Sequence, residues 1–81
     1  MAIRTRYEVV YYRQVLKHGT WDSEDCDWDW DETRKPFYYL EEAKKEFNKA
    51  TPTASTPIIR LYEIQYDRYG DVASRLIDEL V

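Results

Sequence analysis

The chain has 81 residues, with 16 acids against 12 bases, a net charge of −4 and a hydrophobic fraction of 43%. Only 2 glycines are present, so the composition excludes a disordered or low-complexity chain and predicts one small domain over residues 1–81. A single cysteine, Cys26, excludes an intrachain disulfide and predicts a cytoplasmic protein, and no apolar run has the length of a membrane helix.

The first expected element is a strand over residues 5–16, which are dense in β-branched and aromatic types. Both faces of this strand are fairly apolar, which predicts a central strand with a partner on each side. A second strand is expected over about residues 26–34. In an extended chain its side chains alternate, with Cys26, Trp28 and Trp30 on one face and Asp27, Asp29 and Asp31 on the other.

A helix is expected over residues 40–50, because Leu40, Ala43, Phe47 and Ala50 recur at spacings of three and four. Acids fill its first turn and lysines follow, as the helix dipole favours.

Residues 58–66 predict another strand, and residues 67–70 a turn in which Gly70 supplies a positive φ. For residues 71–81 two interpretations stay open. A hairpin strand over 71–76 with a short helical or loose tail is favoured, but the apolar residues also fit a helical stripe behind Asp71.

The order strand, strand, helix, strand, strand predicts an α+β fold. We expect a mainly antiparallel sheet of three to four strands with one helix packed on one face.

The charge of the chain is concentrated. Seven acids and no base lie in the eleven residues from Asp22 to Glu32, while the remaining nine acids and twelve bases give a net charge of +3. Alternate side chains of a strand lie about 6.8 Å apart, close to two phosphate steps of a nucleic-acid strand. The segment therefore indicates a surface for a basic protein groove, and direct binding of nucleic acid is not expected because the acids repel phosphates. The candidate partner-binding residues are Trp21, Asp22, Glu24, Asp25, Asp27, Asp29, Asp31 and Glu32.

The structural alternative is a solvated acidic loop that only keeps the protein soluble and protects a sheet edge. The tryptophans have two interpretations as well, since large rings fill thin cores and also dominate binding sites. We expect one of Trp28 and Trp30 in the core, and Trp21 partly exposed.

The sequence contains no complete motif for catalysis or for metal binding. A calcium loop starting at Asp25 or Asp27 fails, because its sixth and twelfth positions lack the required Gly and Glu. His18 is the only histidine and has no nucleophile near it in sequence, and there is no Gly-rich phosphate loop or Cys/His metal spacing. We expect no enzyme activity, no metal and no cofactor.

Three motifs carry a resemblance over residues 37–77, about half of the chain. They are Leu40-Glu41-Glu42-Ala43, Leu61-Tyr62-Glu63-Ile64 and the turn from Asp67 to Val72. This region resembles small acidic proteins of phages and other mobile elements of bacteria. The resemblance implies an inhibitor of host defence, such as an anti-CRISPR protein that mimics DNA, and it carries over no binding residue.

The expected function is therefore a non-enzymatic binding protein whose acidic, Trp-containing segment engages a basic protein surface, such as that of a nucleic-acid-binding protein. The alternative is a small assembly module that forms a homo-oligomer and whose acidic segment only keeps it soluble. A homodimer could form by pairing of edge strands, or by pairing of a basic patch with the acidic segment of a second copy.

Overall fold

The computed structural model describes the backbone of residues 2–18 and 27–81, and the side chains of residues 2–15 and 29–81. The elements in chain order are β1 (Arg4–His18), β2 (Asp27–Phe37), α1 (Leu40–Lys49), β3 (Ile58–Asp67) and β4 (Gly70–Leu80). The α+β class and the element order predicted from the sequence are confirmed. Within the described ranges, no helix combines the length and the apolar character needed to cross a membrane.

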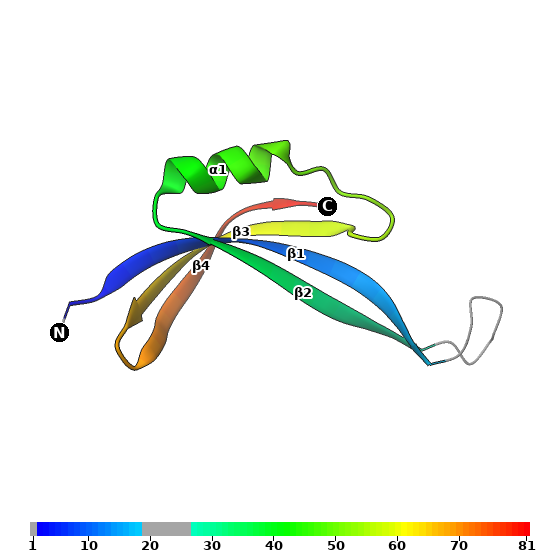
Figure 1. The fold of residues 1–81 in the computed structure, drawn as a ribbon, viewed down its shortest axis with the longest axis horizontal. Coiled ribbons are helices and arrows are strands. Elements are labelled where there is room, and N and C mark those ends of the chain that lie inside the picture. The colour runs from blue at the N-terminus through cyan, green and yellow to red at the C-terminus, as the bar shows by residue number, and fades with distance from the viewer. Residues whose placement is uncertain (1, 19–26) are drawn as a thin grey trace.

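The four described strands form one antiparallel sheet in the order β2-β1-β3-β4 (Figure 1). The prediction of a central first strand is confirmed, because β1 pairs with β2 along one edge and with β3 along the other. Val9 and Val10 are adjacent on β1 and point to opposite faces, yet both are fully buried. Side chains at the centre of the sheet are thus shielded from solvent on both of its faces. The strands β2 and β4 form the two edges.

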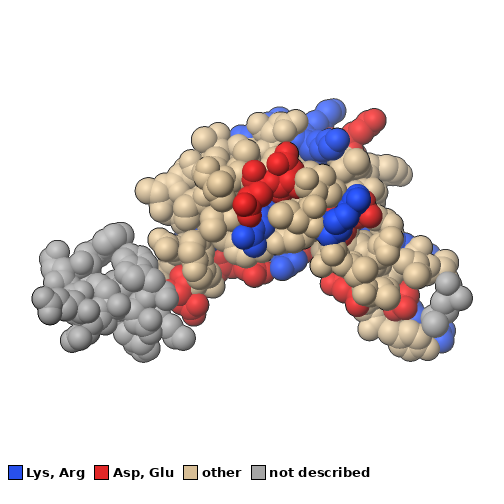
Figure 2. Space-filling view, turned by 180° about the vertical axis from the view of Figure 1, so that it is seen from behind, with Lys and Arg blue, Asp and Glu red and all other residues tan. Residues whose placement is uncertain are grey.

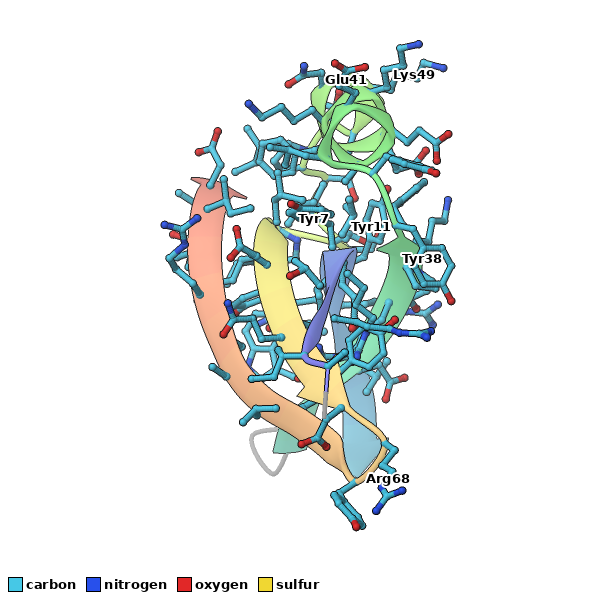
Figure 3. All side chains as sticks on the ribbon, turned by 90° about the vertical axis from the view of Figure 1, so that its left-hand side faces the viewer. Tyr7, Tyr11, Tyr38, Glu41, Lys49 and Arg68 are labelled. Carbon is cyan, nitrogen blue, oxygen red and sulfur yellow. The ribbon has the colours of Figure 1, made fainter. Side chains whose placement is uncertain are left out.

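The helix α1 lies over one face of the sheet (Figure 1). Its apolar stripe points inward, since Ala43 and Phe47 are buried in one cluster with Val9, Ile59 and Leu61. Burial of a ring such as that of Phe47 contributes roughly 1.5–3 kcal/mol. Figure 3 shows the opposite side of the helix, where Glu41 and Lys49 point away from the sheet.

A polar link also joins the helix to the sheet. The Tyr11 hydroxyl donates to Oε1 of Glu46 at 2.7 Å, and Lys35 Nζ donates to the same oxygen at 2.8 Å. Burial, followed by the hydrogen bond to Glu46, raises the pKa of Tyr11 to about 12. The hydrogen bonds from Lys35 and Tyr11 lower the pKa of Glu46. The link joins α1 to both β1 and β2.

The chain end differs from the prediction. β4 continues as a strand to Leu80, so the expected helical or loose tail after residue 76 is wrong. Leu80 pairs with Ile59, and both Ile77 and Leu80 pack against the buried cluster beneath α1. Two register shifts interrupt the pairing of β4 with β3. Each shift changes which side chains share a face, and this produces a helix-like apolar spacing in a strand.

The second strand is longer than expected and runs over Asp27–Phe37 in place of about residues 26–34. It includes Pro36, which an edge strand tolerates because no ladder hydrogen bond is lost where the backbone faces outward.

Candidate binding surface

The sheet face opposite α1 carries no helix within the described residues. We call it the open face, and define it by Arg6, Glu8, Val10 and Tyr12 of β1 together with the residues that pair with them on the neighbouring strands. The register places four residues of β3 and three of β2 on this face, namely Ile58, Arg60, Tyr62, Ile64, Glu32, Arg34 and Pro36.

Glu8 is the buried charge of this face, with an exposed fraction of 5%. Its carboxylate accepts from Arg6 Nε at 3.1 Å and from Arg34 Nη1 at 3.3 Å. Both arginines also reach outward, Arg6 to Asp71 at 2.9 Å and Arg34 to Glu32 at 2.9 Å. Hydrogen bonds to carboxylates raise the pKa of Arg6, with Asp71 the largest contributor. The network joins β2, β1 and β4 across the sheet.

A second group on the open face combines tyrosines with arginines. The guanidinium of Arg60 lies 5.0 Å from the centre of the Tyr12 ring, and that of Arg6 lies 5.0 Å from the Tyr66 ring. The hydroxyls of Tyr12 and Tyr62 are 3.2 Å apart, and Arg60 Nη1 donates to the Tyr62 oxygen at 3.3 Å.

These contacts move the pKa values of the two tyrosines in opposite directions. Burial and then the bond to Tyr62 raise the pKa of Tyr12. Burial also acts to raise the pKa of Tyr62, but hydrogen bonds from Tyr12 and Arg60 outweigh it, and the net shift is downward. Either hydroxyl can donate in this pair, and the Tyr62 oxygen also accepts from Arg60.

Trp30 borders a depression on this face, with an exposed fraction of 45%. The depression has a volume of about 390 Å³ and is lined by Tyr12, Trp30, Glu32, Ile58 and Arg60. Two rings, an aliphatic side chain, a carboxylate and a guanidinium thus meet where β2, β1 and β3 adjoin. We call this depression the Trp30 pocket. Its chemistry suits a side chain with an apolar stem and a polar or charged head.

The predicted partner-binding residues divide into two groups. Trp21, Asp22, Glu24 and Asp25 lie outside the described residues, and of Asp27 the structure describes only the backbone, at the start of β2. Asp29, Asp31 and Glu32 are exposed on β2, and so is Trp30, which was not among the predicted partner-binding residues.

The predicted alternation holds for the described part of β2. Asp29 and Asp31 pair with Val15 and Arg13 and share the face of α1, whereas Trp30 and Glu32 lie on the open face. Trp30 does not fill the core, because it is 45% exposed on an edge strand with no described helix over its face, and the prediction that one of Trp28 and Trp30 is in the core stays a prediction. The side chain of Trp28 lies outside the described residues.

Sequence reasoning missed the contribution of β3 to this surface. Ile58, Arg60 and Tyr62 were expected only as part of a strand. Their spacing of two does place them on one face, but that they share this face with Trp30 follows only from the strand order and register, which residues 58–66 do not encode alone.

Acidic and basic side chains lie beside one another on the side of the protein shown in Figure 2. In the described part of the chain, no group of three or more His, Cys, Asp or Glu side chains is arranged to hold a metal ion. A second depression, of about 380 Å³, lies at the other end of the sheet and is lined by Ala2, Arg4, Tyr66, Asp67 and Arg68.

Comparisons of the chain with protein-family models, with curated proteins and with solved structures found no match.

Proposed function

We propose that the protein is a non-enzymatic binding protein that holds a basic segment of a partner protein at the Trp30 pocket. The observation that carries this proposal is the exposed Trp30 ring beside the Glu32 carboxylate and the Tyr12 ring. A lysine or arginine side chain of the partner places its stem on the rings and its charge near Glu32, so ring contact and ion pairing act together.

Asp29 and Asp31 extend the acidic surface along the other face of β2. Their charges draw a basic partner towards this edge and make the association faster at low ionic strength. In its most specific form, the proposal is an inhibitor of a nucleic-acid-binding protein, of the kind carried by phages, that occupies a groove made for phosphates. The spacing of Asp29 and Asp31, alternate residues on one face, supports this form.

The test starts with affinity capture from a bacterial lysate at low and at high salt, followed by titration of the purified partner. Trp30→Ala is expected to weaken binding about tenfold or more, since a buried tryptophan anchor dominates an interface. The double variant Asp29→Asn/Asp31→Asn is expected to weaken binding at low salt and to have less effect at high salt.

Glu41→Gln/Glu42→Gln is the matched control, because it removes the same charge from the exposed side of α1. Equal affinity of the wild type and the Trp30→Ala variant would contradict the proposal. Capture of no protein at either salt concentration would contradict it as well.

A further inference from the structure

The four charged residues of β2 that lie nearest Thr33 are arranged antisymmetrically about it. Asp31 and Glu32 precede it, and Arg34 and Lys35 follow it. An antiparallel copy of the same strand, centred on Thr33, therefore meets each of these two acids with a base, whereas Asp29 falls opposite Phe37. Trp30 in one copy then lies opposite Pro36 in the other, which is a ring-on-ring apolar contact.

The outer edge of β2 has no strand beside it in the described part of the chain, since β2 ends the order β2-β1-β3-β4. The direction of its backbone groups follows from two hydrogen bonds. Gln14 N–H donates to the carbonyl of Ser55 at 3.3 Å, on the side of β3, so the backbone of Gln14 points away from β2. Its pair on β2 is Trp30, whose N–H is bound instead by the Asp29 carboxylate at 2.8 Å.

Trp30 therefore directs its backbone polar groups to the outer edge, and so do Glu32 and Arg34, because groups on a strand alternate in direction. In the register centred on Thr33, Glu32 lies opposite Arg34 of the second copy. Both residues direct their N–H and C=O groups outward, so the pair exchanges both backbone hydrogen bonds. A one-residue shift of this register brings outward-facing groups against inward-facing ones and is excluded.

The side chains have capacity for the additional partners. Both bonds from Arg34 to Glu32 end on Oε2, at 3.0 Å from Nε and 2.9 Å from Nη2, so neither uses Oε1, which can accept from Arg34 of the second copy. Lys35 donates to Glu46, and its ammonium group carries further protons for Asp31 of the second copy. Pro36 has no N–H, so the ladder ends at this residue in both copies.

The other edge is less suited to this pairing. β4 has two register shifts in its pairing with β3, and such irregularities twist an edge strand away from a straight partner.

We propose that the outer edge of β2 pairs with the β2 edge of a second copy of this chain, with Thr33 on the two-fold axis. The two sheets then form one continuous sheet, and the two open faces lie on the same side. Arg34 and Pro36 of each copy border the Trp30 pocket of the other, so the pocket is completed only in the dimer. The dimer does not depend on the proposed basic partner.

Charge reversal tests the register. Sedimentation equilibrium of the protein alone is expected to give a dimer that dissociates on dilution. Asp31→Lys and Lys35→Glu each place like charges opposite one another in both symmetric pairs, and each is expected to weaken the dimer about tenfold or more. An equimolar mixture of the two variants restores opposite charges at these positions and is expected to recover dimerisation.

Lys49→Glu, on the outer side of α1, is the matched control and leaves the dimer unchanged. A wild-type monomer at all concentrations overturns the proposal. A dimer that survives both single variants, or a mixture that stays monomeric, overturns the register.

A cross-link gives an independent readout. Thr33 lies opposite itself, and the Cα atoms of such a non-hydrogen-bonded pair are about 4.5 Å apart, within the range of about 4.4–6.8 Å found for disulfides. In a Cys26→Ser background, Thr33→Cys is expected to form a covalent dimer under mild oxidation, whereas Ser74→Cys on the β4 edge is expected not to. The reverse result overturns the proposal. Partner capture by the cross-linked dimer tests the proposed function separately, because loss of capture there leaves the dimer itself intact.

Discussion

Arg34 Nη1 lies 3.3 Å from Oε1 of Glu8, and the Glu8 side chain is only 6% exposed although no helix covers its face of the sheet. Arg6 binds the other carboxylate oxygen at 3.1 Å. The buried charge is therefore stabilised by two guanidinium groups, one on each carboxylate oxygen.

Removal of both arginines is expected to destabilise the protein by more than the sum of the single changes. Arg34→Met alone leaves Arg6 on Glu8 and costs about 1–2 kcal/mol, whereas Arg6→Met/Arg34→Met leaves a buried carboxylate without a partner and costs about 3–5 kcal/mol. Denaturant unfolding at neutral pH measures the coupling between the two sites.

Arg75→Met is the matched control, since Arg75 is 72% exposed and binds Glu63 at the surface. This change is expected to alter the free energy of unfolding by less than about 1 kcal/mol. Additive effects of the two single Arg6 and Arg34 changes would show that Glu8 does not depend on them jointly.

The alkaline limb of the stability curve is expected to depend on Tyr11. Its pKa in the folded protein is about 12, above the ordinary value of 10.0, so the folded state retains a proton that the unfolded state loses. The corresponding stabilisation is complete below pH 10 and is lost as the pH rises towards about 12. Tyr11→Phe is expected to abolish this part of the loss in denaturant unfolding measured at a series of alkaline pH values.

Glu46→Gln is the control for this prediction. Burial is the largest cause of the Tyr11 shift and the contact with Glu46 comes second, so this variant is expected to keep most of the alkaline loss. If Tyr11→Phe and the wild type lose stability in parallel above pH 10, the hydroxyl of Tyr11 is not held in the environment described.

The elements that the sequence predicted well are those whose pattern is local. The stripe of Leu40, Ala43 and Phe47 specifies a helix and its buried side, and the two apolar faces of β1 specify a central strand. The strand order of the sheet is not local. It decides that β2 is an edge, and therefore that Trp30 is exposed and not part of the core.

In the candidate surface, too, the sequence predicts what depends on a local pattern and misses what depends on strand pairing. Alternation along β2 correctly separates Asp29 and Asp31 from Trp30, because the side-chain period of a strand is fixed. The contribution of Arg60 and Tyr12 to the Trp30 pocket requires the pairing of β3 with β1. The register shifts of β4 are equally long-range, and they gave its apolar residues a spacing that a helix also has.

The contact between α1 and the sheet is expected to depend on Phe47. This ring is buried with Val9, Ile59 and Leu61, and Phe47→Ala is expected to cost about 3–5 kcal/mol of the free energy of unfolding. For so small a domain this is a large share of the total, and thermal unfolding followed by circular dichroism is expected to show a lower Tm. Tyr38→Ala, which removes a ring that is 69% exposed, is the control and is expected to cost less than about 1 kcal/mol.

The turn between β3 and β4 is expected to require glycine for its backbone conformation alone. Gly70 has a φ of +127°, and a Cβ atom built on it meets no atom within 4 Å. Any cost of Gly70→Ala therefore arises from the dihedral angle, and not from a clash, and about 1–3 kcal/mol is expected.

Ser74→Ala, in β4 beyond the turn, is the control. Ser74 is exposed and the substitution strains no dihedral angle, so the free energy of unfolding is expected to stay within about 0.5 kcal/mol of the wild-type value. The turn itself is ordered by the Asp67 carboxylate, which accepts from the N–H of Tyr69 at 2.8 Å. Asp67→Ala removes this acceptor and is expected to add about 1 kcal/mol to the loss caused by Gly70→Ala if the two effects are independent. A smaller combined loss would show that the strained turn has already opened in the Gly70→Ala variant, so that the Asp67 bond no longer forms in it.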